Sequence, residues 1–318
     1  MNEQKLKFRQ DGTFTIAQFT DVHWIDGCEA DMRSRALMDK VIQEERPDLV
    51  VFTGDIIYTK KSKEGEPPAI DPRHSLHGAV ASVEQQRVRW AWVLGNHDAE
   101  RNITREQLAD EFAAFEYVVS SKGPDHISGY GNFVLELEGR DGSCAAALYG
   151  FDTGDYSKLA HVRGYDWIRR DQIDWYLGES RRLTERNGGE PLPALAFFHI
   201  PLPEYRQVWE TAACYGEKHE DVCAPQLNSG MFAAMVESCD VLGTFCGHDH
   251  VNDYCGELHG IKLCYGRATG YNTYGREGFP RGARLIRLVE GERSFASWLR
   301  LDDGTIILQQ PEHQPNQG

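Results

Sequence analysis

Several strand-like segments of this 318-residue chain end at residues that can bind a metal ion. The continuous apolar run 48–53 is typical of a strand buried on both faces, and it ends at Gly54-Asp55. Four other strand-like runs end similarly, at Asp21 and His23, at Asn96 and His97, at His199, and at His248 and His250. Because sites in open α/β sheets form beyond the carboxyl ends of strands, this placement predicts one site assembled from five strand ends.

Two of these strand ends carry paired ligands that are one residue apart. In an extended chain successive side chains alternate between faces, so Asp21 and His23 should share a face. By the same argument His248 and His250 should share a face, and Asp249 should point away. Two imidazoles on one face suit either two neighbouring metal ions or one ion that is bound twice. Carboxylate, imidazole and amide ligands together suit Fe, Mn or Zn.

Hydrophobic periodicity predicts alternating helices and strands around these motifs. Helices are expected at 31–45, 79–86, 105–115, 171–185 and 230–238, and strands at 14–20, 48–53, 88–94, 132–137, 145–150, 193–198, 241–246, 260–265, 283–288 and 295–299. The polar stretch 59–78 predicts a long surface loop and a candidate lid. Residues 1–310 are expected to form a single α/β domain, and 311–318 a disordered polar tail.

Composition limits the partners and the compartment. The formal net charge of −15 argues against nonspecific binding to nucleic acid or to an anionic membrane. No apolar run approaches the roughly 20 residues that span a bilayer. The first eight residues lack the apolar core of a signal peptide, so we expect a cytoplasmic protein, or a secreted one if a leader was removed.

The eight cysteines include no Cys-x-x-Cys motif. Cys255 could pair with Cys264, or Cys214 with Cys223, across a short loop. In a chain of this size without a leader, we expect free buried thiols instead.

The motif set resembles a known superfamily. Asp21-x-His23, Gly54-Asp55, Gly95-Asn96-His97-Asp98, His199 and Gly247-His248-x-His250 occur in this order along the chain. Over about residues 14–290 this set resembles the calcineurin-like metallophosphoesterase superfamily. Segments 198–205 and 247–253 are similar to its purple-acid-phosphatase-29-like branch. The resemblance implies a four-layer sandwich of two stacked mixed β-sheets flanked by helices.

The resemblance also implies a role for each motif residue. Asp21, His23, Asp55 and His250 would hold one metal ion, and Asp55, Asn96, His199 and His248 a second, with Asp55 bridging. A hydroxide between the ions would attack phosphorus. His97 would act as general acid at the leaving oxygen, and Asp98 would orient or charge it. Asn96, His97 and His199 would also contact the substrate.

One ligand position has two candidates. In purple acid phosphatases a glycine stands where this chain has His23, and a tyrosine three residues after the bridging aspartate binds iron. Tyr58 occupies that tyrosine position here, so His23 and Tyr58 compete for one coordination position. We favour His23, because its spacing from Asp21 places both on one face, and we expect Tyr58 to line the pocket. Tyr205 and His161, in loops near the motifs, are further candidates for substrate contact.

These residues predict hydrolysis of a phosphomonoester at a dinuclear metal centre. The expected substrate is a small phosphorylated molecule or a phosphoprotein. A cyclic-nucleotide phosphodiesterase and a phosphoprotein phosphatase share the metal core and differ in the pocket walls. Two predictions from other classes stay open, a dinuclear amide hydrolase and a noncatalytic binding protein. The sequence leaves the oligomeric state open.

Overall fold

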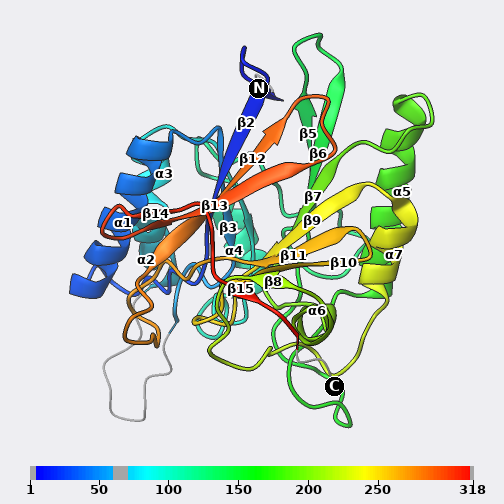
Figure 1. The fold of residues 1–318 in the computed structure, drawn as a ribbon. Helices are drawn as coiled ribbons and strands as arrows, with labels where there is room; N and C mark the ends of the chain where they lie inside the picture. The colour runs from blue at the N-terminus through cyan, green and yellow to red at the C-terminus, as the bar shows by residue number, and fades with distance from the viewer. Residues whose placement is uncertain (1–4, 60–70, 316–318) are drawn as a thin grey trace.

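The strands form two β-sheets in this computed structural model, which describes residues 5–59 and 71–315 (Figure 1). The strands of the nine-stranded sheet are β1 (Leu6–Lys7), β5 (Phe133–Glu138), β6 (Cys144–Gly150), β7 (Ala194–Phe197), β8 (Cys214–Tyr215), β9 (Val241–Cys246), β10 (Cys255–Leu258), β11 (Ile261–Tyr265) and β15 (Glu312–His313). Their order across the sheet is β1-β5-β6-β7-β9-β11-β10-β8-β15.

The second sheet has six strands in the part of the chain that is described. They are β2 (Thr13–Phe19), β3 (Leu49–Thr53), β4 (Trp90–Val93), β12 (Gly282–Val289), β13 (Phe295–Leu301) and β14 (Ile306–Ile307). Their order is β14-β13-β12-β2-β3-β4. Strands β2, β3 and β4 are parallel, and so are β6, β7, β9 and β11. The carboxyl ends of the motif-bearing strands therefore lie together at one edge of each sheet.

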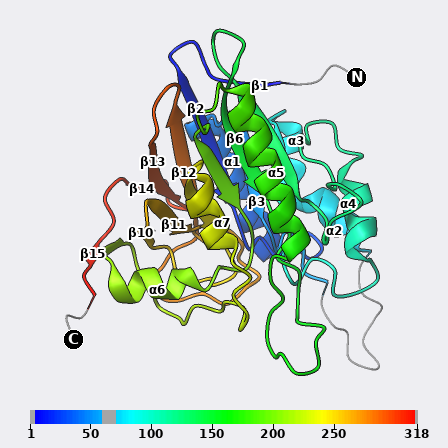
Figure 2. The same cartoon turned by 90° about the vertical axis from the view of Figure 1, so that its right-hand side faces the viewer.

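Helices cover the outer face of each sheet (Figures 1 and 2). The helices are α1 (Glu29–Glu45), α2 (Pro72–Ala79), α3 (Ala81–Gln85), α4 (Arg105–Phe112), α5 (Arg170–Arg186), α6 (Glu204–Thr211) and α7 (Met231–Ser238). Figure 1 places α1, α2 and α3 beside the six-stranded sheet, and α5 and α7 beside the nine-stranded sheet. The predicted four-layer arrangement of two mixed sheets flanked by helices is confirmed.

Neighbouring residues of the central strands enter different hydrophobic cores. Ile16 and Val51 pack between the two sheets, whereas Phe19 and Phe52 pack with the residues of α1. This division follows from the strand period of two, since successive side chains point to opposite faces. Both faces of β3 are buried, which confirms the interpretation of run 48–53.

The structure corrects the prediction of an irregular segment 59–78. Residues 72–79 form α2, so the loop prediction is wrong for that part of the chain. The Asp71 carboxylate accepts a hydrogen bond from the Arg73 backbone N–H at 3.0 Å, and Pro72 stands at the first helical position. Both features are typical of a helix start. Residues 60–70 lie outside the described residues, so the candidate lid stays a prediction.

The prediction of a disordered C-terminal tail is also wrong for residues 312–313. They form β15, which pairs with β8. The His313 ring stacks on Trp209 at a centroid distance of 3.7 Å, and its Nε2–H donates to the Trp209 carbonyl at 3.0 Å. A two-residue strand has no periodicity of its own, so only its long-range partners reveal it.

The cysteine prediction is wrong for one pair. Cys255 and Cys264 are direct neighbours on the antiparallel strands β10 and β11, with a Cα–Cα distance of 4.1 Å, and they form a disulfide. The other six cysteines are free, as predicted, but only Cys214 and Cys246 are buried, so the prediction of burial is wrong for the remaining four. The sequence allowed the Cys255–Cys264 pairing but did not show the hairpin register that produces it.

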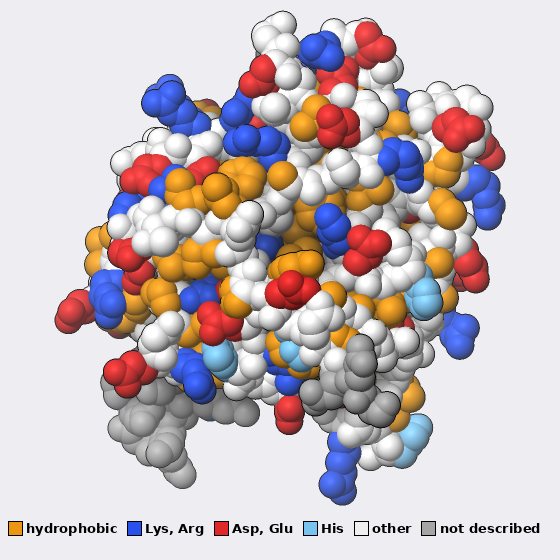
Figure 3. All heavy atoms as spheres, viewed as in Figure 1, with side chains coloured by type: hydrophobic (Ala, Val, Ile, Leu, Met, Phe, Trp, Pro, Cys, Tyr) orange, Lys and Arg blue, Asp and Glu red, His pale blue; other side chains and the backbone are white. Residues whose placement is uncertain are grey.

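The surface shown in Figure 3 mixes acidic, basic and apolar side chains. Among the residues that the structure describes, every helix is too short or too polar to span a bilayer.

A capping box at the start of α4 anchors the loop that connects β4 to this helix. Thr104 Oγ1 accepts from the Gln107 backbone N–H at 3.1 Å, and Gln107 Oε1 accepts from the Thr104 backbone N–H at 3.0 Å. We expect Thr104→Ala to lower the free energy of unfolding by about 1 kcal/mol, because it removes the Oγ1 acceptor of the Gln107 backbone N–H and leaves only the reciprocal bond of the capping box. Urea unfolding measures the change. Thr104→Ser is the control, since it keeps the hydroxyl, and an equal loss in both variants would contradict the capping role.

Candidate metal centre

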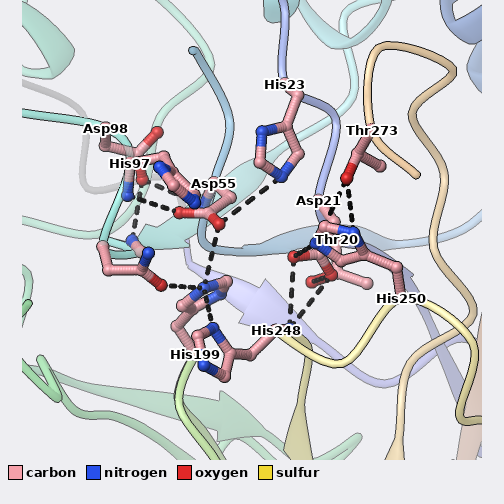
Figure 4. Close-up of polar contacts among 12 residues, drawn as sticks. Thr20, Asp21, His23, Asp55, His97, Asp98, His199, His248, His250 and Thr273 are labelled. Atoms are coloured by element: carbon pink, nitrogen blue, oxygen red, sulfur yellow. Dashed lines mark hydrogen bonds and ion pairs between the residues drawn. The ribbon is translucent and has the colours of Figure 1, made fainter. Parts of the chain in front are cut away.

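The predicted ligands converge into two groups that share one carboxylate (Figure 4). The first group is Asp21, His23, Asp55 and His250, and the second is Asp55, His199 and His248. Within each group the ligand atoms lie within 4.8 Å of one another, and every member is buried. Asn96 joins the second group, because its Oδ1 lies 3.2 Å from His199 Nε2. His248 and His250 thus belong to different groups, as the resemblance implied.

The backbone at these strand ends is left-handed. The φ angles of Asp21, His23, Asp55 and His248 are 54°, 50°, 49° and 77°. The same-face argument from an extended chain is therefore wrong, because β2 ends at Phe19 and these ligands lie beyond regular strands. A non-glycine residue in a sparsely populated backbone region costs about 1–3 kcal/mol. Such strain persists where surrounding structure imposes it, and it clusters at functional sites.

Two motif positions have no room for a side chain and therefore require glycine. A Cβ atom on Gly95 would lie 2.1 Å from Asp55 Oδ1, and one on Gly247 would lie 1.9 Å from Thr20 Oγ1. These distances are far shorter than van der Waals contact. A side chain at position 95 would displace the Asp55 carboxylate, and one at position 247 would displace the Thr20 hydroxyl that supports Asp21. The glycines allow the loops after β4 and β9 to approach the ligands closely.

Asp55 is fixed by backbone and side-chain contacts on both oxygens. Its Oδ1 accepts a hydrogen bond from the His97 backbone N–H at 2.8 Å. Its Oδ2 lies 3.2 Å from His199 Nε2 and 3.4 Å from His23 Nε2. His199 Nδ1–H donates to the Thr53 carbonyl at 2.8 Å, which turns Nε2 toward Asp55. The bridging role implied for Asp55 agrees with this position between the groups.

Asp21 and His250 have supporting contacts of the same kind. Asp21 Oδ2 accepts from the Thr20 hydroxyl at 2.8 Å, and Asp21 Oδ1 lies 3.3 Å from His250 Nε2. The other nitrogen of His250, Nδ1, contacts the Thr273 hydroxyl. Thr273 was not predicted from the sequence, because it follows β11 in a loop without a ligand motif. Its contact leaves Nε2 of His250 facing the first group of ligands.

Burial and mutual contacts set the protonation of the cluster. Burial lowers the pKa of His23 and of His248 to about 3, so both imidazoles are neutral. Burial raises the pKa of Asp21, but His250 lowers it further, to about 2. Burial also opposes ionisation of Asp55, yet His199 holds its pKa well below the ordinary value. His199 differs, because burial lowers its pKa but Asp55 raises it to about 9, so this imidazole would have to lose a proton before it binds a metal ion.

Unpaired buried atoms indicate that the cluster fits metal ions. Within the described residues, His23 Nε2, Asp55 Oδ2 and His248 Nε2 are buried without a hydrogen-bond partner. An unsatisfied buried polar atom costs about 1–3 kcal/mol. Two of these atoms, His23 Nε2 and Asp55 Oδ2, face each other at 3.4 Å, and a bound cation would satisfy both.

The structure contradicts the role predicted for Asp98. Its Oδ2 accepts from the backbone N–H groups of Gly95 at 2.7 Å and Asp55 at 3.0 Å, and its Oδ1 accepts from Ile57 at 2.9 Å. Asp98 therefore ties the end of β4 to the end of β3, and it does not orient His97. Burial and the nearby Asp55 charge raise the pKa of Asp98 to about 6.

The carboxylate beside His97 is Glu100. Its Oε1 lies 2.9 Å from His97 Nδ1, and the His97 side chain is 27% exposed. Burial lowers the pKa of His97, but Glu100 and Asp55 outweigh burial, and the pKa is raised above its ordinary value. Glu100 was not predicted from the sequence, because Asp98 is the carboxylate directly adjacent to His97. Glu100 lies three residues after His97, and the chain turns back between them.

Tyrosine rings border the cluster. Tyr58 lies edge-on to His23 at a centroid distance of 5.6 Å and to His97 at 5.3 Å, and its role as a pocket wall stays a prediction. Tyr165 meets His248 edge-on at 4.4 Å, and Tyr274 lies 4.2 Å from His250. Tyr165 and Tyr274 carry no metal-ligand signal, and their positions depend on long loops.

Two predicted substrate contacts lie elsewhere. Tyr205 is fully buried in the core, and its hydroxyl bonds to Thr244 Oγ1 at 2.8 Å, so its predicted substrate role is wrong. His161 is exposed in the loop between β6 and α5, and the described contacts do not connect it to the ligands. Its substrate role stays a prediction. Asp249 points away from the ligands as predicted, since it accepts from the Tyr265 hydroxyl at 2.5 Å.

Comparison with known proteins identifies the family. Residues 14–252 match the calcineurin-like phosphoesterase family, and this chain belongs to it. The chain is 35% identical to probable inactive purple acid phosphatase 29 of Arabidopsis thaliana, over 94% of this chain and 85% of that protein. It is 33% identical to the phosphatase DCR2 of Saccharomyces cerevisiae, over 94% of this chain and 55% of the yeast protein. These relatives confirm the likeness to the purple-acid-phosphatase-29 branch.

Solved structures share the fold. A dimetal phosphatase from Danio rerio superposes with a TM-score of 0.57 at 15% identity, over 89% of this chain and 98% of that one. GAP50, described as the anchor in the inner membrane complex of Plasmodium, superposes with a TM-score of 0.55 at 10% identity, over 96% of this chain and 90% of that one. At these identities the likeness extends to the fold alone.

The shared position of Asp55 predicts its effect on metal content. We expect Asp55→Asn to lose bound metal from both groups, because the substitution removes the one charge that faces both. Metal analysis after gel filtration measures the loss. The control is Asp174→Asn, since Asp174 is exposed on α5 and belongs to neither group. Wild-type metal content in Asp55→Asn would contradict the bridging position.

The Glu100 contact predicts a shift in the titration of His97. Because Glu100 raises the pKa of His97, Glu100→Gln should lower that pKa and move its titration to lower pH. NMR titration of the imidazole in metal-free protein measures the change. Glu106→Gln, on the exposed face of α4, is the matched control. An unchanged His97 titration in Glu100→Gln would show that Glu100 does not set it.

Proposed function

We propose that the protein hydrolyses phosphomonoesters at a dinuclear centre of transition-metal ions. The observation that carries the proposal is the position of Asp55, which belongs to both groups of buried ligands. One carboxylate between two sets of imidazole and carboxylate ligands suits two ions about 3.5–4 Å apart. Asp21, His23 and His250 complete one set, and Asn96, His199 and His248 complete the other. The ligand types suit Fe, Mn or Zn.

Bound ions would supply an activated water and neutralise charge on the phosphoryl group. The remaining work falls to residues of the chain. Asn96 and His199 lie where they can orient the phosphoryl oxygens, and Asp55 holds the backbone of His97 in place. His97 donates a proton to the leaving oxygen as the phosphorus–oxygen ester bond breaks, while water adds to phosphorus and loses a proton. Glu100 favours the protonated form of His97.

The proposal includes catalysis, although three relatives from Arabidopsis thaliana are named probable inactive purple acid phosphatases 29, 14 and 28. The yeast relative is named a phosphatase. What supports activity is that each ligand position is filled and that the ligand atoms converge in one buried cluster. A binding protein without catalysis would not need a partly exposed histidine ion-paired with Glu100 beside the ligands.

A substrate panel with metal-reconstituted protein tests the proposed function. The protein is loaded separately with Fe, Mn and Zn and assayed on aryl and alkyl phosphomonoesters, a phosphodiester, a cyclic nucleotide, a phosphopeptide and an amide. We expect phosphomonoesters to be the best substrates. Faster turnover of the diester or of the phosphopeptide would favour the related activities instead. Turnover of the amide alone, or of no compound in the panel, would contradict the proposal.

The general-acid role predicts a dependence on the leaving group. His97→Ala should keep its metals and lose about 10²- to 10⁴-fold in kcat on an alkyl phosphate, because a poor leaving group needs a proton. On a nitrophenyl phosphate the loss should be much smaller, since that leaving group departs unprotonated. His126→Ala, an exposed histidine of another loop, is the control. Full activity of His97→Ala on the alkyl phosphate would contradict the role.

The partners and the compartment are part of the proposal. A small phosphorylated molecule is the proposed substrate, and the net charge of −15 argues against nonspecific binding to nucleic acid or to an anionic membrane. We keep the cytoplasm as the proposed location, although the Cys255–Cys264 disulfide is more typical of an oxidising compartment.

A further inference from the structure

The loop between β6 and α5 holds two tyrosines in a fixed stack beside the metal centre. Tyr156 and Tyr165 form an antiparallel β-bridge, so a small hairpin places one ring on the other. Their centroids are 5.5 Å apart with an interplanar angle of 24°. The Ser157 backbone N–H donates to the Gly164 carbonyl at 2.9 Å, and that of Asp166 to the Asp155 carbonyl at 3.1 Å. The stack is therefore held by backbone pairing on both sides.

The tyrosine stack begins at a ligand and ends in solvent. The Tyr165 ring meets the His248 ring edge-on at 4.4 Å. The Tyr156 ring lies on the outer side, shares a hydrogen bond with Asn96, and is 47% exposed. A tyrosine ring gains free energy when it is buried or stacks on another planar group. A half-exposed ring that is fixed beside buried ligands is therefore a candidate surface for substrate binding. Nothing in the loop itself uses that open face of Tyr156.

A third ring lies beside the position that we propose for the leaving group. Tyr58 is 5.3 Å from His97, the residue that we place at the leaving oxygen. Asn96, which contacts Tyr156, is the chain neighbour of His97. Tyr58 and Tyr156 thus approach the general acid from two different loops. A planar leaving group attached to the phosphoryl oxygen would meet aromatic surface there, whereas a branched or saturated group could not stack.

We propose that the site selects phosphomonoesters of phenols, and that Tyr156 determines this preference by stacking on the aromatic leaving group. The inference rests on the proposed function and adds the substrate class to it. Tyr165 stacks on the Tyr156 ring, and the Tyr58 ring lies next to His97. The same chemistry is presented by a free aryl phosphate and by a phosphorylated tyrosine of a peptide.

Binding of phosphonates tests the preference without catalysis. Benzylphosphonate and cyclohexylmethylphosphonate match in charge and size, and neither has an ester bond to hydrolyse. With metal-loaded full-length protein, calorimetry should give roughly three- to tenfold tighter binding of the benzyl compound, the range expected for one aromatic stack. Equal affinities, or no binding of either compound, would overturn the inference.

Variants assign the preference to the ring. Tyr156→Leu should abolish the difference between the two phosphonates, and Tyr156→Phe should keep it, because the ring remains. Tyr215→Leu is the matched control, since Tyr215 is 51% exposed on β8, outside the site. A benzyl preference that survives in Tyr156→Leu would overturn the assignment. Unchanged metal content in each variant shows that the centre is intact.

Two further experiments distinguish a phosphotyrosine peptide from a small aryl phosphate as the substrate, and they test the inference separately from the proposed function. A peptide carrying phosphonomethylphenylalanine is compared with the free amino acid: tighter binding of the peptide assigns the substrate to phosphotyrosine, and equal binding assigns it to small aryl phosphates. Turnover of phenyl phosphate is measured in parallel. If the benzyl preference appears without turnover of any ester, the inference holds and the proposed function fails. If turnover occurs without the preference, the inference alone fails.

Discussion

The whole site depends on the carboxylate of Asp55. The chain brings Asp55 to the end of the buried strand β3 and turns its backbone into the left-handed region, with φ of 49°. One oxygen is then held by the His97 backbone N–H, and the other faces His23 and His199. Both groups of ligands meet at this carboxylate, so an error of about 1 Å in its position would separate them.

Asp98 explains how the ends of β3 and β4 keep that position. Three backbone N–H groups, from Gly95, Asp55 and Ile57, donate to one buried carboxylate. The last residue of the Gly95-Asn96-His97-Asp98 motif thus supports the backbone, although its place next to His97 suggested a role in proton transfer. The carboxylate that contacts His97 is that of Glu100.

The sequence predicted which side chains meet at the site, because metal-competent residues after apolar runs are a local signal that parallel strands bring together. It could not predict the left-handed backbone that aims Asp21 and His23, since that conformation is imposed by contacts with residues 54–55. Tyr165 and β15 were missed for a related reason. Their places are set by pairing between distant segments, and neither segment has a periodic pattern of its own.

The central claim is that two metal ions share Asp55. Anomalous X-ray diffraction from crystals of the manganese-loaded protein tests it most directly, because each bound ion gives its own peak. Two ions that share Asp55 should give two peaks about 3.5–4 Å apart, both within bonding distance of its carboxylate. One peak should lie beside His250 and the other beside His248. A single peak, or two peaks of which only one contacts Asp55, would contradict it.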